Sequence, residues 1–299
     1  MHEHNRMAYS EHQSLSVFLP SLSYHSIGAV MFSDIILRSG LTGFRMLDIG
    51  AGDGQFSVAL VRKLHELNID IFSIVGLDPD SDNLDAYKKS FLNVTTSVET
   101  LVGEIEGYRT WPAVRFDIII ASHSLYEFLE NPEIASEEKV AFAKHLYRML
   151  NPGGMILLSL AGRSSHAYKV KRDVLSMLAI DDRSAYGEDL FDIIRQAFSD
   201  DQIGFSAYDS YMDASFAIAS SEHIASWTRY FCRLTMDEYE RLGESIVQGV
   251  IRCHATQFLS LPESFREQFM RYPAFCGSPN DETLVLPHAE TLVTISAPL

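Results

Sequence analysis

Three glycines and two aspartates follow an apolar run in the stretch MLDIGAGDGQF, residues 46–56. The run before Gly50 is typical of a buried strand, and an amphipathic helical pattern begins near Gln55. The glycines therefore occupy a strand-to-helix turn. Glycine lets a ligand approach the backbone closely and also adopts positive φ without strain, so the turn predicts either a ligand cradle or a tight turn that needs glycine for its conformation alone.

A second acidic residue ends the next predicted strand. The segment VGLDPD places Asp78 about 26 residues after Gly52, where a carboxylate can accept hydrogen bonds from both hydroxyls of a ribose. An Asp-Pro turn is the alternative interpretation. The spacing of Gly50, Gly52 and Gly54 does not match the dinucleotide fingerprint, whose third glycine lies further along the chain.

Asp53 lies where the helix after the turn begins. Phosphate groups bind at helix N-termini because the positive end of the helix dipole faces them. A carboxylate at that end disfavours an anion and tolerates a cation. The turn therefore favours S-adenosylmethionine, which carries a sulfonium and an amino group, over a dinucleotide.

Asp48 before the turn, Asp78 after the second strand and LNPGG before the fifth strand occur together in this chain. Their conjunction resembles class I S-adenosylmethionine-dependent methyltransferases. The resemblance implies S-adenosyl-L-methionine as the cofactor, with Asp48 among the residues that bind it. It implies no metal.

Short apolar runs alternate with helical patterns through the middle of the chain, and the third strand is expected at VTTSV. This alternation predicts an α/β fold, a Rossmann-like seven-stranded, mostly parallel sheet flanked by helices. We expect an N-terminal helical lid over 1–40 and a donor-binding core over 41–220. A helical insertion and a final strand over 221–299 would complete the sheet and cover the substrate pocket. Ligands bind at strand carboxyl ends in such sheets.

The composition of the chain limits the classes of partner that we expect. The 299 residues carry a formal net charge of -16 at pH 7, which repels phosphate backbones and argues against nucleic acid as a substrate. The three cysteines are odd in number and widely spaced, as expected for a reducing compartment. The N-terminus is polar, and no segment has the ~18 to 20 apolar residues of a membrane span. We therefore expect a cytoplasmic protein without membrane partners.

Five segments, in their order along the chain, resemble histamine N-methyltransferase: SEHQSL, FDIIIASHSLYE, GRSSHAYKVK, YDSYMDAS and AETLVTISA. The resemblance covers most of the chain. It implies that the donor is held by Gly50, Gly52, Asp78 and Asn83, with Ser122 beside the adenosyl group.

The same resemblance places the family's substrate carboxylate on Glu11, its strand-four glutamine on His123 and its C-terminal asparagine on Glu290. The last two differ from the family, and the tryptophans that the family has after strand five are missing. Two carboxylates and an imidazole suggest a substrate with more cationic or hydrogen-donor character than histamine. Tyr126 is a candidate for the aromatic wall of the pocket.

Each substrate-site residue also has a purely structural interpretation. Glu11 is favoured in the first turn of a helix capped by Ser10. His123 closes the fourth strand and would then be a satisfied polar residue, although strand carboxyl ends are where sites collect. Glu290 precedes an apolar strand and would be solvated, and Tyr126 fits the core equally well.

The sequence as a whole predicts a methyltransferase that N-methylates a small amine by direct in-line displacement. In this hypothesis Glu11 and Glu290 orient the amine, and His123 hydrogen-bonds it or accepts its proton. One alternative is O- or carboxyl-methylation of a small metabolite, which the same fold performs. A second alternative is a non-catalytic sensor that binds S-adenosylmethionine.

Overall fold

A computed structural model describes the chain in six stretches, residues 24–94, 96–111, 113–261, 263, 266–267 and 283–298. The chain divides into two compact units. The sheet unit comprises His25–Gly162, Ser184–Tyr208 and Glu290–Leu299. The helical unit comprises Met1–Tyr24, Arg163–Arg183 and Asp209–Ala289.

These boundaries differ from the predicted divisions at residues 40/41 and 220/221. The first described helix, α2 (Tyr24–Ser39), lies almost entirely within the sheet unit. Segment 163–183, predicted as part of the core, is grouped with residues 209–289. The role of segment 1–40 as a lid therefore stays a prediction.

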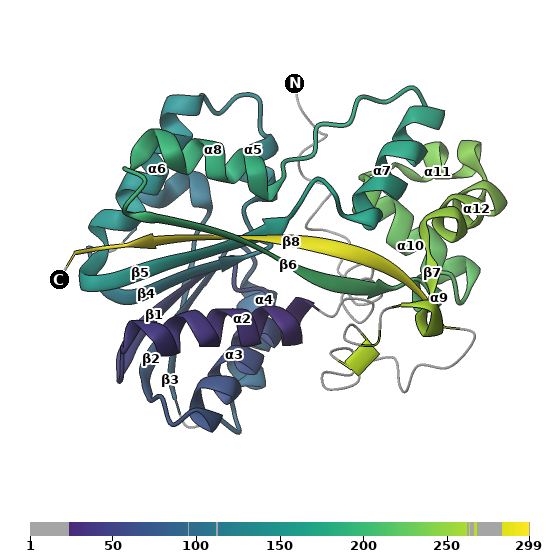
Figure 1. Cartoon of the computed structure of the whole chain (residues 1–299). Helices are drawn as coiled ribbons and strands as arrows, with labels where there is room; N and C mark the ends of the chain where they lie inside the picture. Colours follow the sequence, from purple (N-terminus) through teal and green to yellow (C-terminus); the bar gives the residue numbers. More distant parts are fainter. Residues whose placement is uncertain are drawn as a thin grey trace. The chain divides into compact units, whose positions relative to one another are not determined.

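The described residues form an eight-stranded sheet with the order β3-β2-β1-β4-β5-β8-β6, and the two-residue β7 pairs with β8 (Figure 1). The pairs from β3 through β5 are parallel, and β8 is antiparallel to β5. The predicted fold class is therefore confirmed. The strands are β1 (Phe44–Ile49), β2 (Ile71–Asp78), β3 (Ser97–Val102), β4 (Phe116–Ser122), β5 (Leu150–Ala161), β6 (Ile203–Asp213), β7 (Thr256–Gln257) and β8 (Leu284–Ser296).

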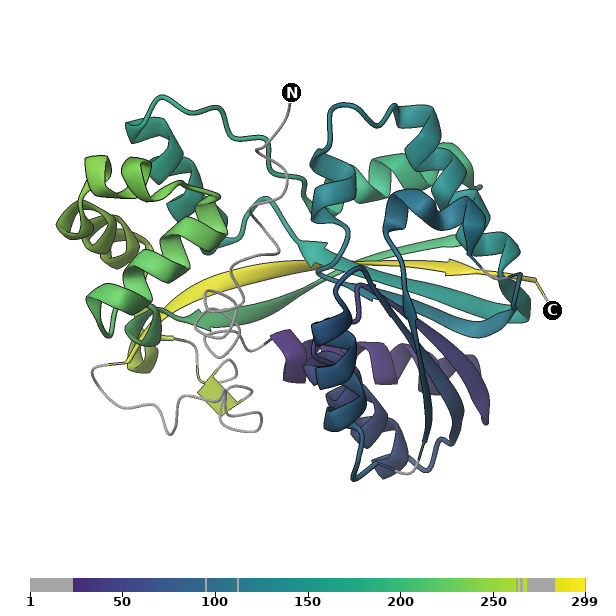
Figure 2. The same ribbon diagram turned by 180° about the vertical axis from the view of Figure 1, so that it is seen from behind.

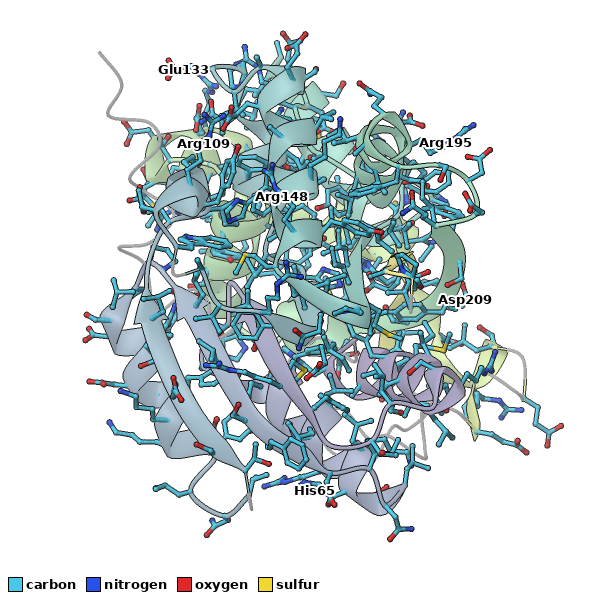
Figure 3. The ribbon with its side chains drawn as sticks, turned by 90° about the vertical axis from the view of Figure 1, so that its left-hand side faces the viewer. His65, Arg109, Glu133, Arg148, Arg195 and Asp209 are labelled. Carbon is cyan, nitrogen blue, oxygen red and sulfur yellow. The ribbon has the colours of Figure 1, made fainter. Side chains whose placement is uncertain are left out.

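Helices cover both faces of the sheet in the sheet unit. On one face lie α2, α3 (Gln55–Glu66) and α4 (Ser81–Ser90), and on the other lie α5 (Tyr126–Glu130), α6 (Ser136–Arg148) and α8 (Gly187–Ala197). In Figure 3, Arg148 of α6 and Arg195 of α8 lie on one side of the sheet and His65 of α3 on the other. Figure 2 shows α3 and α4 side by side on their shared face.

Because helices cover both faces of the sheet, its central strands consist of continuous apolar runs. In β4, Ile118, Ile119 and Ile120 are all fully buried, as expected for a parallel strand with helices on both sides. Alternation along β1 directs Leu47 and Ile49 into the core beneath α5 and α6. The residue between them, Asp48, points to the opposite face, towards α3.

Local signals set the ends of these elements. The Asp80 side chain accepts from the Asp82 N–H at 2.8 Å and from the Asn83 N–H at 3.4 Å, and so caps α4. The third strand begins later than the predicted VTTSV, because its pairing with β2 starts at Ser73 opposite Ser97.

The helical unit has its own core around Trp227, which is fully buried. Its helices are α7 (His166–Met177), α9 (Ala214–Ala217), α10 (Ser221–Cys232), α11 (Met236–Leu242) and α12 (Glu244–His254). In the described part of the chain, no helix has the length and apolar character needed to cross a membrane.

Candidate functional site

The glycine turn connects β1 to α3 at the carboxyl end of β1. Gly50, Gly52 and Gly54 all have positive φ, at 66°, 53° and 84°. A Cβ on Gly50 would lie 2.2 Å from the Ser124 Cβ, whereas no described atom lies within 4 Å of a Cβ on Gly52. All three positions therefore favour glycine because of their positive φ. At Gly52 no described atom would block the approach of a ligand to the backbone.

The carboxylate of Asp78 holds this turn. Its Oδ2 accepts the Gly52 N–H at 2.9 Å, and its Oδ1 accepts the Asp80 N–H at 3.0 Å and the Asn83 side-chain amide at 3.3 Å. Asp78 is buried, and burial raises the pKa of its carboxyl, while the Asp80, Gly52 and Asn83 donors lower it. The structure thus brings Gly52, Asp78 and Asn83 together, and their role in donor binding stays a prediction.

Asp53 occupies the start of α3. Its Oδ1 accepts the Gln55 backbone N–H at 3.2 Å, and its Oδ2 accepts the Gln55 side-chain amide at 2.7 Å. A negative charge therefore already sits at the helix end where a dinucleotide phosphate would bind. This geometry favours a cationic ligand next to the turn.

Asp48 lies beneath the turn and faces the protein interior. It is 4 % exposed and accepts a hydrogen bond from the Ser57 hydroxyl of α3. Burial raises the pKa of Asp48 to about 6, the hydroxyls of Ser57 and Tyr87 lower it, and the charge of Asp78 raises it. Asp48 therefore ties β1 to the helices behind it, and any part it has in donor binding stays a prediction.

The loop after β4 touches the same turn. The Ser124 hydroxyl donates to the Ile49 carbonyl at 2.6 Å, at the last residue of β1. Ser122, which ends β4, lies beside Ser159 of β5 with their hydroxyl oxygens 3.3 Å apart. Ser124 was not among the predicted residues. Its only sequence signal is its place beside His123 at a strand carboxyl end.

His123 and Glu290 meet at the carboxyl ends of β4 and β5. The His123 Nε2 lies 2.9 Å from the Glu290 Oε2, and the Glu290 side chain is fully buried. Glu290 pairs with Ala161, the last residue of β5. Predicted separately from segments far apart in the chain, the two residues are in close contact within the sheet unit.

Tyr126 completes this cluster from the first turn of α5. Its hydroxyl oxygen lies 2.8 Å from the His123 Nδ1 and accepts the Ala161 backbone N–H at 2.9 Å. The hydroxyl therefore faces the imidazole, which the interpretation of Tyr126 as simple aromatic wall or core did not include.

His25 is the residue that the sequence reasoning missed. It lies at the beginning of α2 and is 5 % exposed. Burial lowers its pKa to about 3, the nearby His123 lowers it further, and the Glu290 carboxylate opposes both. His25 is therefore neutral at pH 7. A histidine at the start of the otherwise apolar segment YHSIGAVMF was the signal that could have found it.

Glu11 falls outside the described residues, so its predicted role at the substrate site stays a prediction. Among the residues that the structure does describe, no group of three or more His, Cys, Asp or Glu side chains has the arrangement of a metal site.

Comparison with known proteins decides the family. The sequence matches the profile of a methyltransferase domain over residues 26–188, more than half of the chain. The chain belongs to this methyltransferase family.

Individual relatives are more distant. Malonyl-[acyl-carrier protein] O-methyltransferase 2 of Ilyobacter polytropus is 28 % identical over 123 residues, 41 % of each chain, so the match spans less than half of that relative. A solved Bacillus halodurans protein described as a methyltransferase is 14 % identical over 89 % of this chain and 98 % of its own, with a TM-score of 0.49. Magnesium protoporphyrin IX methyltransferase of Synechocystis PCC 6803, solved with SAH, is 16 % identical over 64 % of this chain and 78 % of its own, with a TM-score of 0.44.

The residues of the turn fit S-adenosylmethionine. The backbone at Gly52 is open to a ligand, the buried Asp78 carboxylate stands at the end of β2, and Asp53 provides a negative charge at the start of α3. A sulfonium and an ammonium group are compatible with two carboxylates.

The raised pKa of Asp48 predicts a pH-dependent stability. The folded protein binds a proton at Asp48 more tightly than the unfolded chain does, so this contribution is complete below pH 3.8 and is lost as the pH rises to about 6. A shift of this size corresponds to about 3 kcal/mol. We expect the free energy of unfolding of the wild type, relative to Asp48→Asn, to fall by about this amount between about pH 3 and 7.

Urea unfolding at a series of pH values measures this difference. Ser57→Ala serves as a companion variant, since the loss of its hydrogen bond should move the wild-type transition to higher pH. A difference between wild type and Asp48→Asn that stays constant from pH 4 to 7 would contradict the assignment.

Proposed function

We propose that this methyltransferase transfers the methyl group of S-adenosylmethionine to the nitrogen of a small amine. The observation that carries the proposal is the contact between His123 and the fully buried carboxylate of Glu290. Isolated buried charges are costly, so a carboxylate in such a place is suited to a cationic or hydrogen-donating partner. The resemblance to histamine N-methyltransferase supports the same class of acceptor.

In the proposal, the glycine turn with Asp78 and Asn83 holds the donor, and Ser122 lies beside its adenosyl group. The bound donor supplies an electrophilic methyl group on a sulfonium sulfur. Ser124 joins the loop that carries His123 to the end of β1, where the turn begins. This bond supports a direct transfer in which placement of the two reactants supplies about 7 to 11 kcal/mol of the barrier reduction.

An amine must lose a proton before its nitrogen can attack. In the proposal the His123–Glu290 pair takes that proton, and Glu11 helps to orient the amine. General bases of this kind contribute roughly 10²- to 10⁴-fold to the rate. Tyr126, bonded to His123, forms part of the same wall.

The second candidate function is methylation of a carboxyl oxygen. The name of the Ilyobacter polytropus relative favours it, since that protein is a malonyl-[acyl-carrier protein] O-methyltransferase. The burial of Glu290 argues against it. Two like charges about 4 Å apart repel by about 4 kcal/mol at an effective dielectric of 20, which disfavours a carboxylate acceptor beside Glu290.

We also propose a small, soluble acceptor and a cytoplasmic location. The net charge of -16 supports an acceptor that is not a nucleic acid. The three widely spaced cysteines, an odd number, support the cytoplasmic location.

The proposed donor contact predicts a loss of affinity in Asp78→Asn. Removing the charge from a hydrogen-bonding carboxylate costs about 1.5 to 3 kcal/mol, so S-adenosylmethionine should bind roughly 10- to 100-fold more weakly. Isothermal titration of the purified protein measures the change. Asp82→Asn, an exposed residue in the first turn of α4, is the matched control and should bind as the wild type does. Equal affinity of Asp78→Asn and wild type would contradict the assignment.

The acceptor class is tested by mass spectrometry of the protein incubated with S-adenosylmethionine and matched sets of small amines, alcohols and carboxylic acids. We expect methylated product from the amine set. His123→Ala should methylate the amine more slowly, with a changed dependence on pH. Methyl esters without methylated amines would contradict the proposal and support carboxyl methylation.

A further inference from the structure

The imidazole of His123 is fixed at three points. Its backbone N–H donates to the Ser159 carbonyl at 2.9 Å, with φ at 56°. Its Nδ1 lies 2.8 Å from the Tyr126 hydroxyl, and its Nε2 lies 2.9 Å from the Glu290 carboxylate. Positive φ is uncommon outside glycine and aims the side chain in one direction. Which ring nitrogen carries the proton therefore decides what this side chain can do.

The partners of Tyr126 bear on that question. The Ala161 N–H donates to the Tyr126 oxygen at 2.9 Å. A phenol has one proton to give, and with a backbone donor already directed at its oxygen, that proton is well placed to go to the His123 Nδ1. In the opposite arrangement the His123 Nδ1–H would donate to the Tyr126 oxygen. That oxygen would then accept two N–H donors, and the phenol proton would have to point away from the imidazole.

An Nδ1 that accepts from Tyr126 leaves the proton of the neutral ring on Nε2. The Nε2 lies 2.9 Å from the buried Oε2 of Glu290, although this contact does not have the geometry of a hydrogen bond. In this state the ring of His123 keeps no lone pair for a bound amine. The carboxylate oxygens of Glu290 still have accepting capacity.

We propose that Tyr126 is a positioning residue that fixes neutral His123 as the Nε2–H tautomer, so that Glu290 accepts the proton of the acceptor nitrogen. This inference rests on the proposed amine methylation and deepens it. In the step, an N–H bond of the ammonium group breaks, its proton forms an O–H bond on the Glu290 carboxylate, and the electron pair stays on nitrogen as the attacking lone pair. His123 holds the carboxylate in place.

The tautomer can be measured without turnover. The experiment records long-range ¹H–¹⁵N spectra of the full chain labelled with ¹⁵N-histidine, with the His123 signals identified by their loss in His123→Gln. We expect a protonated Nε2 and an unprotonated Nδ1 in the wild type, and a clear shift towards the Nδ1–H form in Tyr126→Phe. Tyr147→Phe removes a hydroxyl that bonds Gln202 elsewhere in the sheet unit and is the matched control. An Nδ1–H ring in the wild type, or an unchanged tautomer in Tyr126→Phe, would overturn the proposal.

Kinetics supply a second arm. On an amine that the wild type methylates, Glu290→Gln should lower kcat at least 100-fold, and His123→Gln should lower it less. Tyr126→Phe should lower kcat about 3- to 10-fold with little change in KM. A loss in His123→Gln as large as that in Glu290→Gln would assign the base to His123 and overturn the proposal. A wild type that methylates no amine is a failure of the proposed function, which the spectra distinguish from a failure of the tautomer.

Discussion

The complete burial of the Glu290 carboxylate is the constraint on which the rest of the candidate site depends. Removing an ion of this kind from water costs several kcal/mol, and the cost is offset only if charged or hydrogen-bonding groups surround it. The Nε2 of the His123 imidazole lies 2.9 Å from this carboxylate, and the carboxylate acts electrostatically on His25. This buried carboxylate lies at the strand ends where ligands bind in such sheets. In the proposed function, its charge therefore restricts the acceptors that the methyltransferase can accommodate.

Hydrogen bonds within the sheet unit connect the glycine turn to the loop that carries His123. Asp78 fixes the glycine turn through the Gly52 N–H. The neighbour of His123, Ser124, fixes the end of β1 through the Ile49 carbonyl. A Cβ on Gly50 would collide with Ser124, so the close approach of the two loops requires glycine there. The glycine turn and the contact between His123 and Glu290 are therefore joined by the same short loops.

Spacing within the sequence was enough to predict that Gly52 and Asp78 lie together. The strand-turn-helix pattern around Gly52 and the acid at the end of the next strand lie close in sequence, and the parallel βαβ topology fixes where they meet. Spacing did not indicate the environment of Asp48, whose side chain is turned by the alternation along β1 towards Ser57 in the interior.

The acceptor side was less predictable from sequence. His123 follows β4 and Glu290 lies on β8, and these two strands flank β5, so their 2.9 Å contact depends on the antiparallel register of β5 and β8. The resemblance to a known family named both residues but not their pairing. His25 and the bond from Tyr126 to His123 were missed, because a histidine and a tyrosine at the starts of helices have many structural explanations.

The central claim is that the buried charge of Glu290 selects an amine. The most direct measurement is the affinity of a methylated-amine product and of its isosteric carboxylic acid, determined by isothermal titration in the presence of S-adenosylhomocysteine, for the wild type and Glu290→Gln. We expect the wild type to bind the amine at least 10-fold more tightly than the acid and Glu290→Gln to lose this preference, because the substitution removes one charge from a desolvated site. Tighter binding of the acid by the wild type, or an unchanged preference in Glu290→Gln, would contradict the claim.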